Sequence, residues 1–426
     1  MADLLALSAR LIDERITDEP ANRVTNELSE LDDGLAVVES FSHSWALRTD
    51  EGLVVLDASG AFTGQQVVAA LRQWSTEPVH TLVYTHGHVD HVGGSGAFVA
   101  DGRERGHRAP RVVGHVNVPP RFDRYEATNG FNLAINARQF GGVRPRPGYG
   151  IGGSTRFLPP DVARCTDTYT DRLTVAVGGV ELQLRHARGE TDDHTWAWIP
   201  SRRAVAVGDF ITWVFPNAGN PQKVQRYPGE WAAALREMAA LEPELLLPAH
   251  GLPVGGRDRI ARVLGDVAGA LEHVVASVLV MMNEGATLDE IVATVRIDDG
   301  ILSLPYLRPI YDEPEFVVRN VWRMYGGWWD GNPARLKPPR DAAVAAEVAA
   351  LAGGAEVLAR RALEVADERL ACQLAEWAVQ AEPESSAAHA ARAQVYERRR
   401  KAELSLMAKG VYGAAARESA EAGGGS

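Results

Sequence analysis

A cluster of histidine and aspartate side chains constrains the fold of this chain more than any other feature. The segment THGHVDHVGG at 85–94 places His86, His88, Asp90 and His91 within six residues, directly after an apolar, β-branched stretch that reads as a strand. A continuing strand would point His91 away from His86 and His88, so the four side chains converge only if the chain turns at once. The two glycines that follow supply the freedom for such a turn. Imidazole and carboxylate ligands suit zinc, and also iron or manganese, so the cluster predicts a metal site.

Three further ligand candidates stand alone later in the chain: His194, Asp209 and His250. Each lies at the end of a predicted strand, beside glycine or in a polar turn, which is where α/β folds place their chemistry. A single histidine such as His194 is more often an ordinary core or surface residue. The three residues together with the cluster are better explained by one metal centre, which would use five of the twelve histidines.

Alternating short strands and helices predict an α/β catalytic domain over residues 1–256. Residues 101–165 are rich in glycine, proline and arginine and show little periodicity, so we expect an insertion over the active site. Period-two alternation predicts the strands, and helical spacing predicts one early helix. The strands are expected within 34–58, 80–85, 173–184 and 194–208, and the helix over 64–74.

After residue 256 the composition shifts to alanine, leucine, glutamate and arginine with helical spacing. We therefore expect an all-α domain over residues 257–420. The last residues, 421–426, end in GGGS and read as a linker or tag remnant.

The net charge of −12 predicts an acidic surface, which argues against nucleic acid or an anionic membrane as a partner. The two cysteines lie far apart in sequence, which argues against a disulfide framework and against a thiolate metal site. No apolar run approaches the ~20 residues of a membrane-spanning helix. These features together predict a cytoplasmic protein that acts on a small molecule.

The pattern HxHxDH followed by single His, Asp and His residues resembles the metallo-β-lactamase superfamily over residues of about 30–255. The resemblance implies a four-layer αββα sandwich with two zinc ions at one edge, iron or manganese being alternatives. Two cations that share a carboxylate would lower the pKa of a bridging water toward neutrality, and Asp90 would orient the resulting hydroxide or accept its proton. Carried over residue by residue, the first metal would be bound by His86, His88 and His194, the second by Asp90, His91 and His250, and both by Asp209.

The segment VRNVWRMYGGWWDGNPARLKPP at 318–339 resembles the alkyl sulfatase branch of this superfamily. In that branch the C-terminal helical region is a dimerisation domain, so the resemblance implies a homodimer. The segment NLAINARQFGG at 132–142 resembles the insertion of the same branch. It implies that Asn136 and Arg138 line the substrate pocket.

The sequence departs from the alkyl sulfatase pattern at two places. Members of the branch carry glutamates where this chain has His194 and Asp209. The segment FITWVFPNAGNPQKVQRY at 210–227 lacks the histidines that normally contact the sulfate and the leaving group. Trp213 and Phe215 stand roughly in their place and suggest an apolar pocket.

Three charged residues near these positions remain open to two interpretations. Lys223 and Arg226 could bind an anionic substrate, or they could lie as a solvated pair before a helix. Glu190, four residues before His194, could hold that histidine in place, or it could be a solvated turn residue.

The resulting hypothesis is a binuclear metal-dependent hydrolase that attacks an ester of an apolar organic molecule, with a sulfate ester among the candidates. The alternative is a lactonase, a β-lactamase or another hydrolase of C–O or C–N bonds on the same metal site, which Trp213 and Phe215 favour. A non-catalytic, metal-containing assembly protein is a third hypothesis, and the complete ligand set argues against it.

Overall fold

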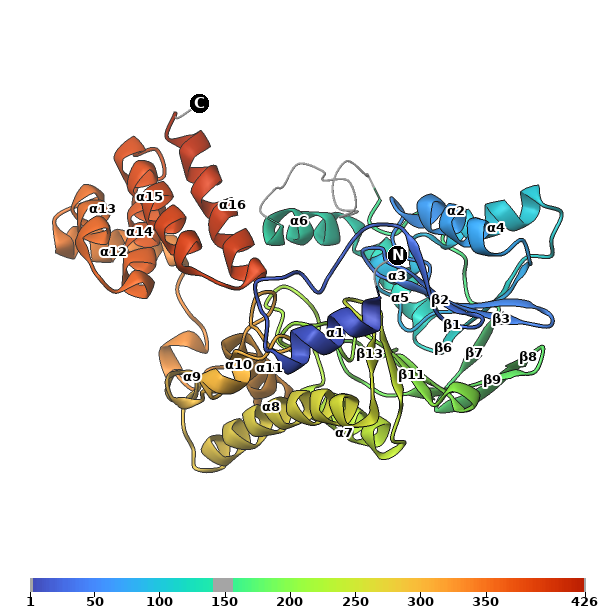
Figure 1. Cartoon of the computed structure of the whole chain (residues 1–426). Coiled ribbons are helices and arrows are strands. Elements are labelled where there is room, and N and C mark those ends of the chain that lie inside the picture. The colour runs from blue at the N-terminus through green and yellow to red at the C-terminus, as the bar shows by residue number, and fades with distance from the viewer. Residues whose placement is uncertain (1–2, 141–155, 425–426) are drawn as a thin grey trace. The chain divides into compact units, whose positions relative to one another are not determined.

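The computed structural model describes residues 3–140 and 156–424, and the chain divides into two compact units (Figure 1). All seven predicted metal ligands lie in the first unit. The first unit comprises Met1–Leu133, Pro145–Ala286 and Glu290–Tyr325, and the second comprises Ala134–Arg144, Thr287–Asp289 and Gly326–Ser426.

The first sheet has seven strands that follow one another in sequence order, β1 to β7. The strands β1 to β4 pair antiparallel, and the strands β4 to β7 pair in parallel. Because β4, β5 and β6 are parallel, the loops that follow them lie at one edge of the sheet. The strands are β1 Leu28–Asp32, β2 Leu35–Val38, β3 Ser44–Thr49, β4 Gly52–Leu56, β5 Val79–Val83, β6 Arg111–His115 and β7 Asp167–Tyr169.

The second sheet has six strands in the order β13-β12-β11-β10-β9-β8. Its single parallel pair is β11 with β12. Each of these two strands is followed by a predicted ligand, Asp209 after β11 and His250 after β12. A glycine turn joins β8 to β9, and Gly178 and Gly179 both have positive φ there. The strands are β8 Arg172–Val177, β9 Val180–His186, β10 Thr195–Ile199, β11 Ala204–Gly208, β12 Leu245–Pro248 and β13 Val254–Gly255.

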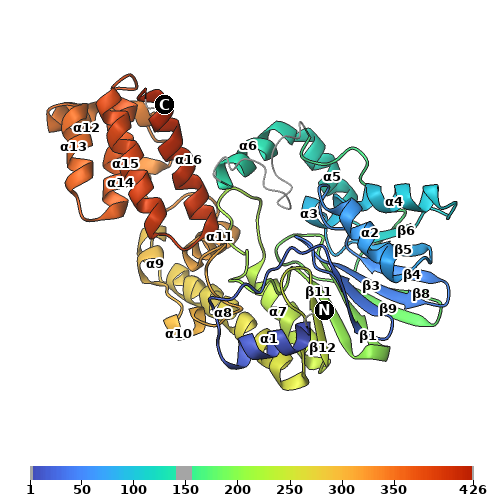
Figure 2. The ribbon, with the colours of Figure 1, turned by 45° about the horizontal axis from the view of Figure 1, so that its top comes forward.

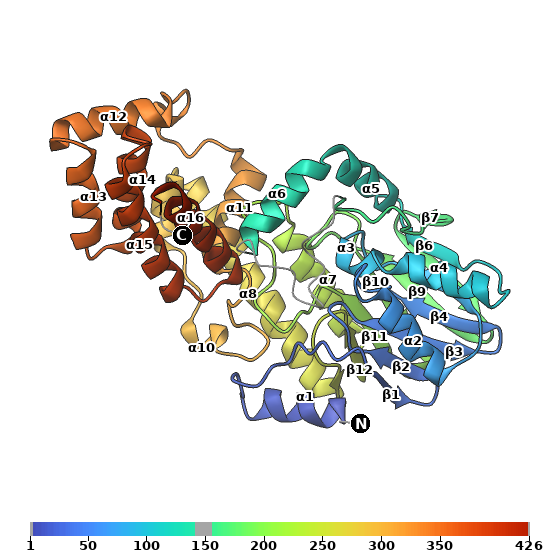
Figure 3. The same ribbon diagram turned by 90° about the horizontal axis from the view of Figure 1, so that it is seen from above.

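The two sheets stack face to face, and side-chain alternation on β2 shows how. Leu35 and Val37 join the core between the sheets, whereas Val38 joins a second core on the outer face of the first sheet. That outer face is covered by α2, α4 and α5, and the outer face of the second sheet is covered by α7 and α8 (Figures 2 and 3). The predicted αββα sandwich is therefore confirmed. The helices are α2 Gly64–Trp74, α4 Ser95–Glu104, α5 Val118–Ala127, α7 Pro228–Ala240 and α8 Arg257–Asn283.

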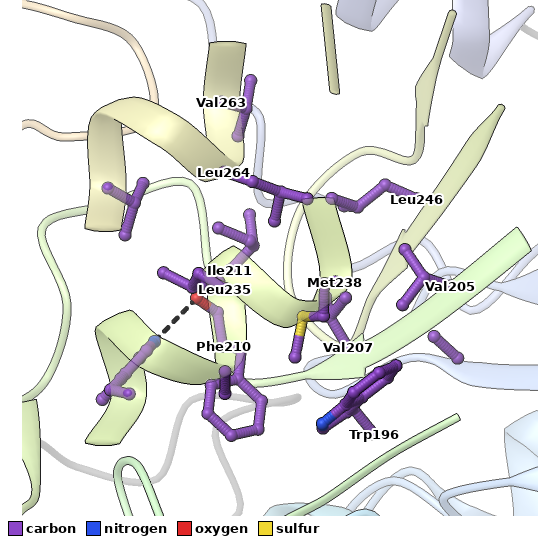
Figure 4. Close-up of a cluster of buried hydrophobic side chains, with 14 of the residues drawn as sticks. Trp196, Val205, Val207, Phe210, Ile211, Leu235, Met238, Leu246, Val263 and Leu264 are labelled. Carbon is purple, nitrogen blue, oxygen red and sulfur yellow. Dashed lines mark hydrogen bonds between the residues drawn. The ribbon is translucent and has the colours of Figure 1, made fainter. Parts of the chain in front are cut away.

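The core beneath the second sheet supports the strand that leads to Asp209. Strand and helix side chains interdigitate there, and all of them are buried (Figure 4). Dense packing of this kind resists small displacements of the backbone. The core side chains include Trp196, Val205 and Val207 from the strands, Leu235 and Met238 from α7, and Val263 and Leu264 from α8.

Residues 101–165 are not the irregular insertion that the sequence predicted. Their described part contains β6, which pairs with both β5 and β7 inside the sheet, as well as α5 and α6 (Asn129–Gln139). Residues 141–155 lie outside the described residues. A five-residue strand that is buried on both faces has no polar–apolar alternation, which is why the pattern was missed.

The helices that follow residue 256 are divided between the two units. α8 is apolar enough by length and composition to cross a membrane, but it buries Ile260 and Leu264 against α7 in the core of the first unit. α11 (Pro314–Gly326) buries Val317 and Val321 in the same core. The first unit therefore extends past the predicted boundary at 256 to Tyr325. A short helix precedes the strands of the two sheets in the sequence, and two short helices follow them. They are α1 Leu4–Asp13, α9 Leu288–Thr294 and α10 Asp299–Leu302.

The second unit is built mainly from the helices α12 to α16 (Figure 2). Alanine side chains of α12 to α15 make up much of its buried clusters. Side-chain caps start several of these helices: the Asp367 carboxylate accepts from two backbone N–H groups, and the Ser385 hydroxyl accepts from one. Helices were predicted here from the composition, and the structure confirms them. They are α12 Asp341–Ala352, α13 Ala355–Glu364, α14 Glu368–Ala381, α15 Ser386–Ala402 and α16 Leu406–Ala422.

Candidate metal centre

The turn predicted after β5 is present. α3 (Val89–Val92) follows the strand with His88 at its N-cap, and the His88 carbonyl accepts the N–H of His91 at 3.0 Å. The glycines have a different role from the one predicted. A Cβ on Gly94 would lie 2.1 Å from the carbonyl oxygen of Ala58, so the residue is needed for close packing rather than for backbone freedom.

The Asp209 carboxylate lies between two groups of potential ligands. Its Oδ2 is 3.7 Å from Nε2 of His86, and its Oδ1 is 3.4 Å from Nε2 of His91 and 3.5 Å from Nε2 of His250. Within each group, one ligand atom from every residue lies within 4.8 Å of the others. One group is His86, His88 and Asp209, and the other is Asp90, His91 and His250.

Asp90 is the most exposed carboxylate of the centre. Its Oδ2 lies 3.5 Å from Nε2 of His91 and 3.4 Å from Nε2 of His250, and 29% of its side chain is exposed. The Asp209 side chain is only 7% exposed. Asp90 is therefore the carboxylate that both belongs to a ligand group and can exchange a proton with a molecule in the pocket.

Two buried atoms of the centre, Nε2 of His91 and Oδ1 of Asp209, form no hydrogen bond with any described residue. Buried polar atoms without a partner are rare in folded proteins. A divalent cation fits, because imidazole nitrogens and carboxylate oxygens converge there. Burial also lowers the pKa of His86 and of His88 well below the usual value, so both rings are neutral near pH 7, which is the form that binds a metal.

A buried aspartate that the sequence did not reveal orients His91. The Asp57 carboxylate lies 2.8 Å from Nδ1 of His91 and accepts hydrogen bonds from the N–H and the hydroxyl of Thr85, each at 2.7 Å. Burial alone would lower the pKa of His91, but the carboxylates of Asp209, Asp90 and Asp57 raise it well above the usual value. Such a carboxylate fixes the ring so that Nε2 faces the centre. The position of Asp57 at the end of β4 was the available signal.

His194 is not placed as the predicted ligand of the first metal. Its Nε2 accepts a hydrogen bond from the backbone N–H of Asp209 at 3.1 Å. Its ring stacks on Phe210, with centroids 4.3 Å apart. It belongs to neither ligand group. The assignment of His194 as a metal ligand stays a prediction, and in this structure its Nε2 faces the backbone N–H of Asp209.

Glu190 lies beside the first group instead. Its side chain is buried, with Oε1 3.7 Å from Nδ1 of His88 and 3.0 Å from the Arg226 guanidinium. Burial and the carboxylates of Asp209 and Asp90 raise the pKa of Glu190 to about 8, so a cation next to it would stabilise its charged form. The interpretation as a solvated turn residue is wrong.

Comparison with known proteins agrees with the fold and the centre. The family model of the metallo-β-lactamase superfamily matches residues 37–250, and the model of the alkyl sulfatase dimerisation family matches residues 287–422. The chain belongs to the metallo-β-lactamase superfamily. It also carries the alkyl sulfatase dimerisation region, so the recognition made from the sequence is confirmed.

Among curated proteins, the chain is 26% identical to a linear primary-alkylsulfatase of Pseudomonas sp. (strain ATCC 19151), over 83% of this chain and 69% of that protein. It is 28% identical to an (R)-specific secondary-alkylsulfatase of Pseudomonas sp., over 82% of this chain and 56% of that protein. The chain thus spans little more than half of the second relative. The solved structure of the stereoselective inverting sec-alkylsulfatase Pisa1 from Pseudomonas sp. superposes with a TM-score of 0.79 at 23% identity, covering 94% of this chain and 66% of that one, which shows the shared fold.

The two aromatic residues predicted to face the substrate lie in the hydrophobic core of the first unit instead. Phe215 is 0% exposed, and Trp213 is 2% exposed with its indole N–H donating to the Leu252 carbonyl. Neither side chain can touch a substrate without a rearrangement of the core. This burial disagrees with their assignment as substrate-binding residues, because both side chains pack in the core that also contains residues of α7 and α11.

Arg226 and Lys223 are not a solvated pair. Arg226 is 2% exposed and forms an ion pair with Glu190, which also accepts a hydrogen bond from the Asn217 amide. The Lys223 ammonium lies 5.8 Å from the centroid of the Phe157 ring. Burial, and then the charge of Arg226, lower the pKa of Lys223 to about 8.

The predicted pocket residues Asn136 and Arg138 lie on α6. Asn136 is buried and Arg138 is exposed, and both belong to the second compact unit. Their role in binding a substrate stays a prediction.

Proposed function

We propose that this protein is a binuclear metal-dependent hydrolase that cleaves an ester of an apolar organic molecule, with sulfate esters as the leading substrate class. The single observation that carries the proposal is the position of Asp209, whose two carboxylate oxygens face two separate groups of histidine and carboxylate ligands. The curated relatives, which are named as alkylsulfatases, support the choice of sulfate ester.

The donor atoms divide naturally between two cations. His86 and His88 with Glu190 would hold the first, Asp90, His91 and His250 would hold the second, and Asp209 would contact both. Imidazole nitrogen and carboxylate oxygen make zinc the expected metal, with iron or manganese as alternatives. When bound, two such cations polarise the scissile ester and lower the pKa of water at the centre.

Asp90 is the residue that would move a proton. Its side chain is 29% exposed, with Oδ2 near His91 and His250, so the carboxylate can accept a proton from the attacking water. Asp57 keeps His91 in the orientation that this step needs.

The positive charge of Lys223 favours the binding of an anionic substrate. The Lys223 side chain is partly buried, and its ammonium interacts electrostatically with Glu190 and Asp90, so its charge lies near the centre. A partly buried cation attracts an anion more strongly than a fully solvated one does, because water screens it less. The pairing of Arg226 with Glu190 favours the second candidate, a hydrolase of neutral C–O or C–N bonds such as a lactonase or β-lactamase, because part of the positive charge is already neutralised.

The decisive experiment is a substrate panel. The zinc-loaded protein is assayed with alkyl sulfate esters, carboxylic esters, lactones and β-lactams, with and without a chelator. Chelator-sensitive turnover of sulfate esters supports the leading proposal, and turnover of neutral esters or lactams alone supports the second candidate. A fully loaded protein that turns over none of them contradicts both.

A further inference from the structure

We propose that His194 is a positioning residue that holds the backbone of Asp209 and is not a metal ligand. This inference rests on the proposed two-metal centre. It starts from the hydrogen bond between the backbone N–H of Asp209 and Nε2 of His194, 3.1 Å long and fully buried. Because Nε2 accepts that proton, the neutral ring carries its own proton on Nδ1, a buried atom that has no hydrogen-bond partner among the described residues.

The surrounding chain is built to keep the ring in this position. Gly208 has a φ of +52°, and a Cβ there would lie 2.6 Å from Nε2 of His194. Any other residue at position 208 would therefore displace the ring or the turn. On one face the ring stacks on Phe210, at an interplanar angle of 22°, and Phe210 itself contacts the edge of Trp231. Phe210 belongs to the core drawn in Figure 4.

The backbone of His194 is held as firmly as its ring. Its carbonyl accepts from the N–H of Ala187 at 3.1 Å and lies 2.9 Å from Nδ1 of His186. The next residue, Thr195, donates its N–H to the carbonyl of Thr85, immediately before the histidine cluster. His194 thus links three segments that meet at the centre.

The consequence concerns the geometry of the shared carboxylate. Asp209 presents its two oxygens to different ligand groups, so a small rotation of its backbone would move both oxygens at once. The hydrogen bond from its N–H to His194 fixes that rotation. Residues that orient a metal ligand typically change metal affinity or activity by roughly 10- to 100-fold when they are replaced.

The test compares two substitutions by their metal content. His194→Phe keeps an aromatic ring against Phe210 but removes the acceptor, and Glu190→Gln removes the carboxylate beside His88. Both variants are loaded with saturating zinc, and bound zinc is measured by elemental analysis. A competing chelator then gives the dissociation constants. His389→Phe, at a buried histidine of the second unit, is the matched control for loss of a buried ring.

We expect His194→Phe to bind two zinc ions per chain with affinity weakened roughly 10- to 100-fold, Glu190→Gln to bind one, and His389→Phe to match the wild type. Loss of one zinc ion in His194→Phe with both retained in Glu190→Gln would show that His194 is the ligand and overturn the inference. Unchanged affinity in His194→Phe would overturn it as well. His194→Gln, which places an amide oxygen near the former Nε2, should restore most of the affinity.

A measurement on the unaltered chain keeps the inference testable if the variants do not fold. In protein loaded with ¹¹³Cd and labelled with ¹⁵N-histidine, the expected ligand rings, His86, His88, His91 and His250, show scalar coupling to cadmium. A fifth coupled histidine would contradict the assignment. None of these readouts needs a substrate, so a failure of the proposed hydrolase activity is distinguishable from a failure of this inference.

Discussion

At the residue scale, the centre separates into groups that bind, groups that orient and one group that can exchange a proton. Asp209 lies between the two ligand groups, Asp57 and His194 hold ligands in place, and Asp90 is the accessible carboxylate. Lys223 adds a partly buried positive charge that interacts electrostatically with Glu190 and Asp90. Each role can be tested by a substitution that changes one property at a time.

Asp90→Asn should keep the fold and the first metal but lower turnover by roughly 10²- to 10⁴-fold, because the amide has the same shape but cannot accept the proton. The comparison is made at equal metal content with whichever substrate the panel identifies. Asp50→Asn, in an exposed turn, is the control and should retain wild-type turnover. An Asp90→Asn variant that keeps more than about a tenth of the wild-type rate would show that Asp90 does not transfer the proton.

Lys223→Met should raise KM for an anionic ester about tenfold, since a charge-assisted contact contributes roughly 1.5 kcal/mol, and should leave neutral esters unaffected. In the wild type, burial lowers the pKa of Lys223 to about 8, and a lysine is charged below its pKa. KM for the anion should therefore rise as the pH increases through that value. Lys337→Met removes an exposed lysine and serves as the control. A pH profile identical in Lys223→Met and wild type would refute the assignment.

The sequence predicts those residues of the metal centre that lie close together along the chain better than those that lie far apart. His86, His88, Asp90 and His91 are recognisable because one turn brings them together. Glu190 and His194 lie in the same short segment, and the sequence does not show which of them faces the metal centre. In the structure the His194 ring faces the N–H of Asp209 instead. No local pattern encodes that contact across sheet strands.

At the element scale, α11 holds the loop that follows Asp209. The Asn320 amide donates to the carbonyls of Ala218 at 2.9 Å and of Arg226 at 3.0 Å, and the Asp312 carboxylate accepts the N–H of Gly219 at 2.7 Å. A helix inside the region matched by the dimerisation family therefore supports a loop of the catalytic unit.

Asn320→Ala should lower the free energy of unfolding by about 1–3 kcal/mol, because the carbonyl of Ala218 loses this donor and the carbonyl of Arg226 keeps only the one from Gln225. It should also raise KM without changing bound metal, since the loop carries Lys223 and Arg226 but no ligand. Denaturant unfolding, steady-state kinetics and elemental analysis measure the three quantities. Arg319→Ala, which removes an exposed ion pair on the same helix, should have little effect on any of them. Lost zinc in Asn320→Ala would contradict this division of roles.

Elements with a clear period were predicted well, and those without one were not. The helix predicted over 64–74 is α2, and the strands β2 to β5 and β8 to β11 lie within or overlap the ranges where strands were expected, whereas β1, β7 and β13 lie outside them. β6 and α5 were missed, because a short strand buried on both faces resembles an apolar loop when glycine and arginine surround it. The inward fold of Trp213 and Phe215 is a tertiary effect of α7 and α11 packing, and the local sequence does not show it.

At the scale of the whole molecule, the dimerisation region predicts a homodimer. Trp328 is 70% exposed and Leu336 is 51% exposed, which is unusual for large apolar side chains. Small-angle scattering at micromolar concentration should give the mass of two chains. Trp328→Glu should shift that mass toward one chain, whereas Lys409→Glu should not. A monomeric wild type under these conditions would rule the homodimer out.

The measurement that most directly tests the central claim is the zinc stoichiometry of the chain. Metal-free protein is titrated with zinc, and bound metal is determined by elemental analysis after removal of the excess. The account predicts two zinc ions per chain in the wild type and, in Asp209→Ala, weakened binding at both positions, because one carboxylate faces both ligand groups. A wild-type chain that binds no zinc, or an Asp209→Ala variant that binds two zinc ions as tightly as the wild type, would contradict it.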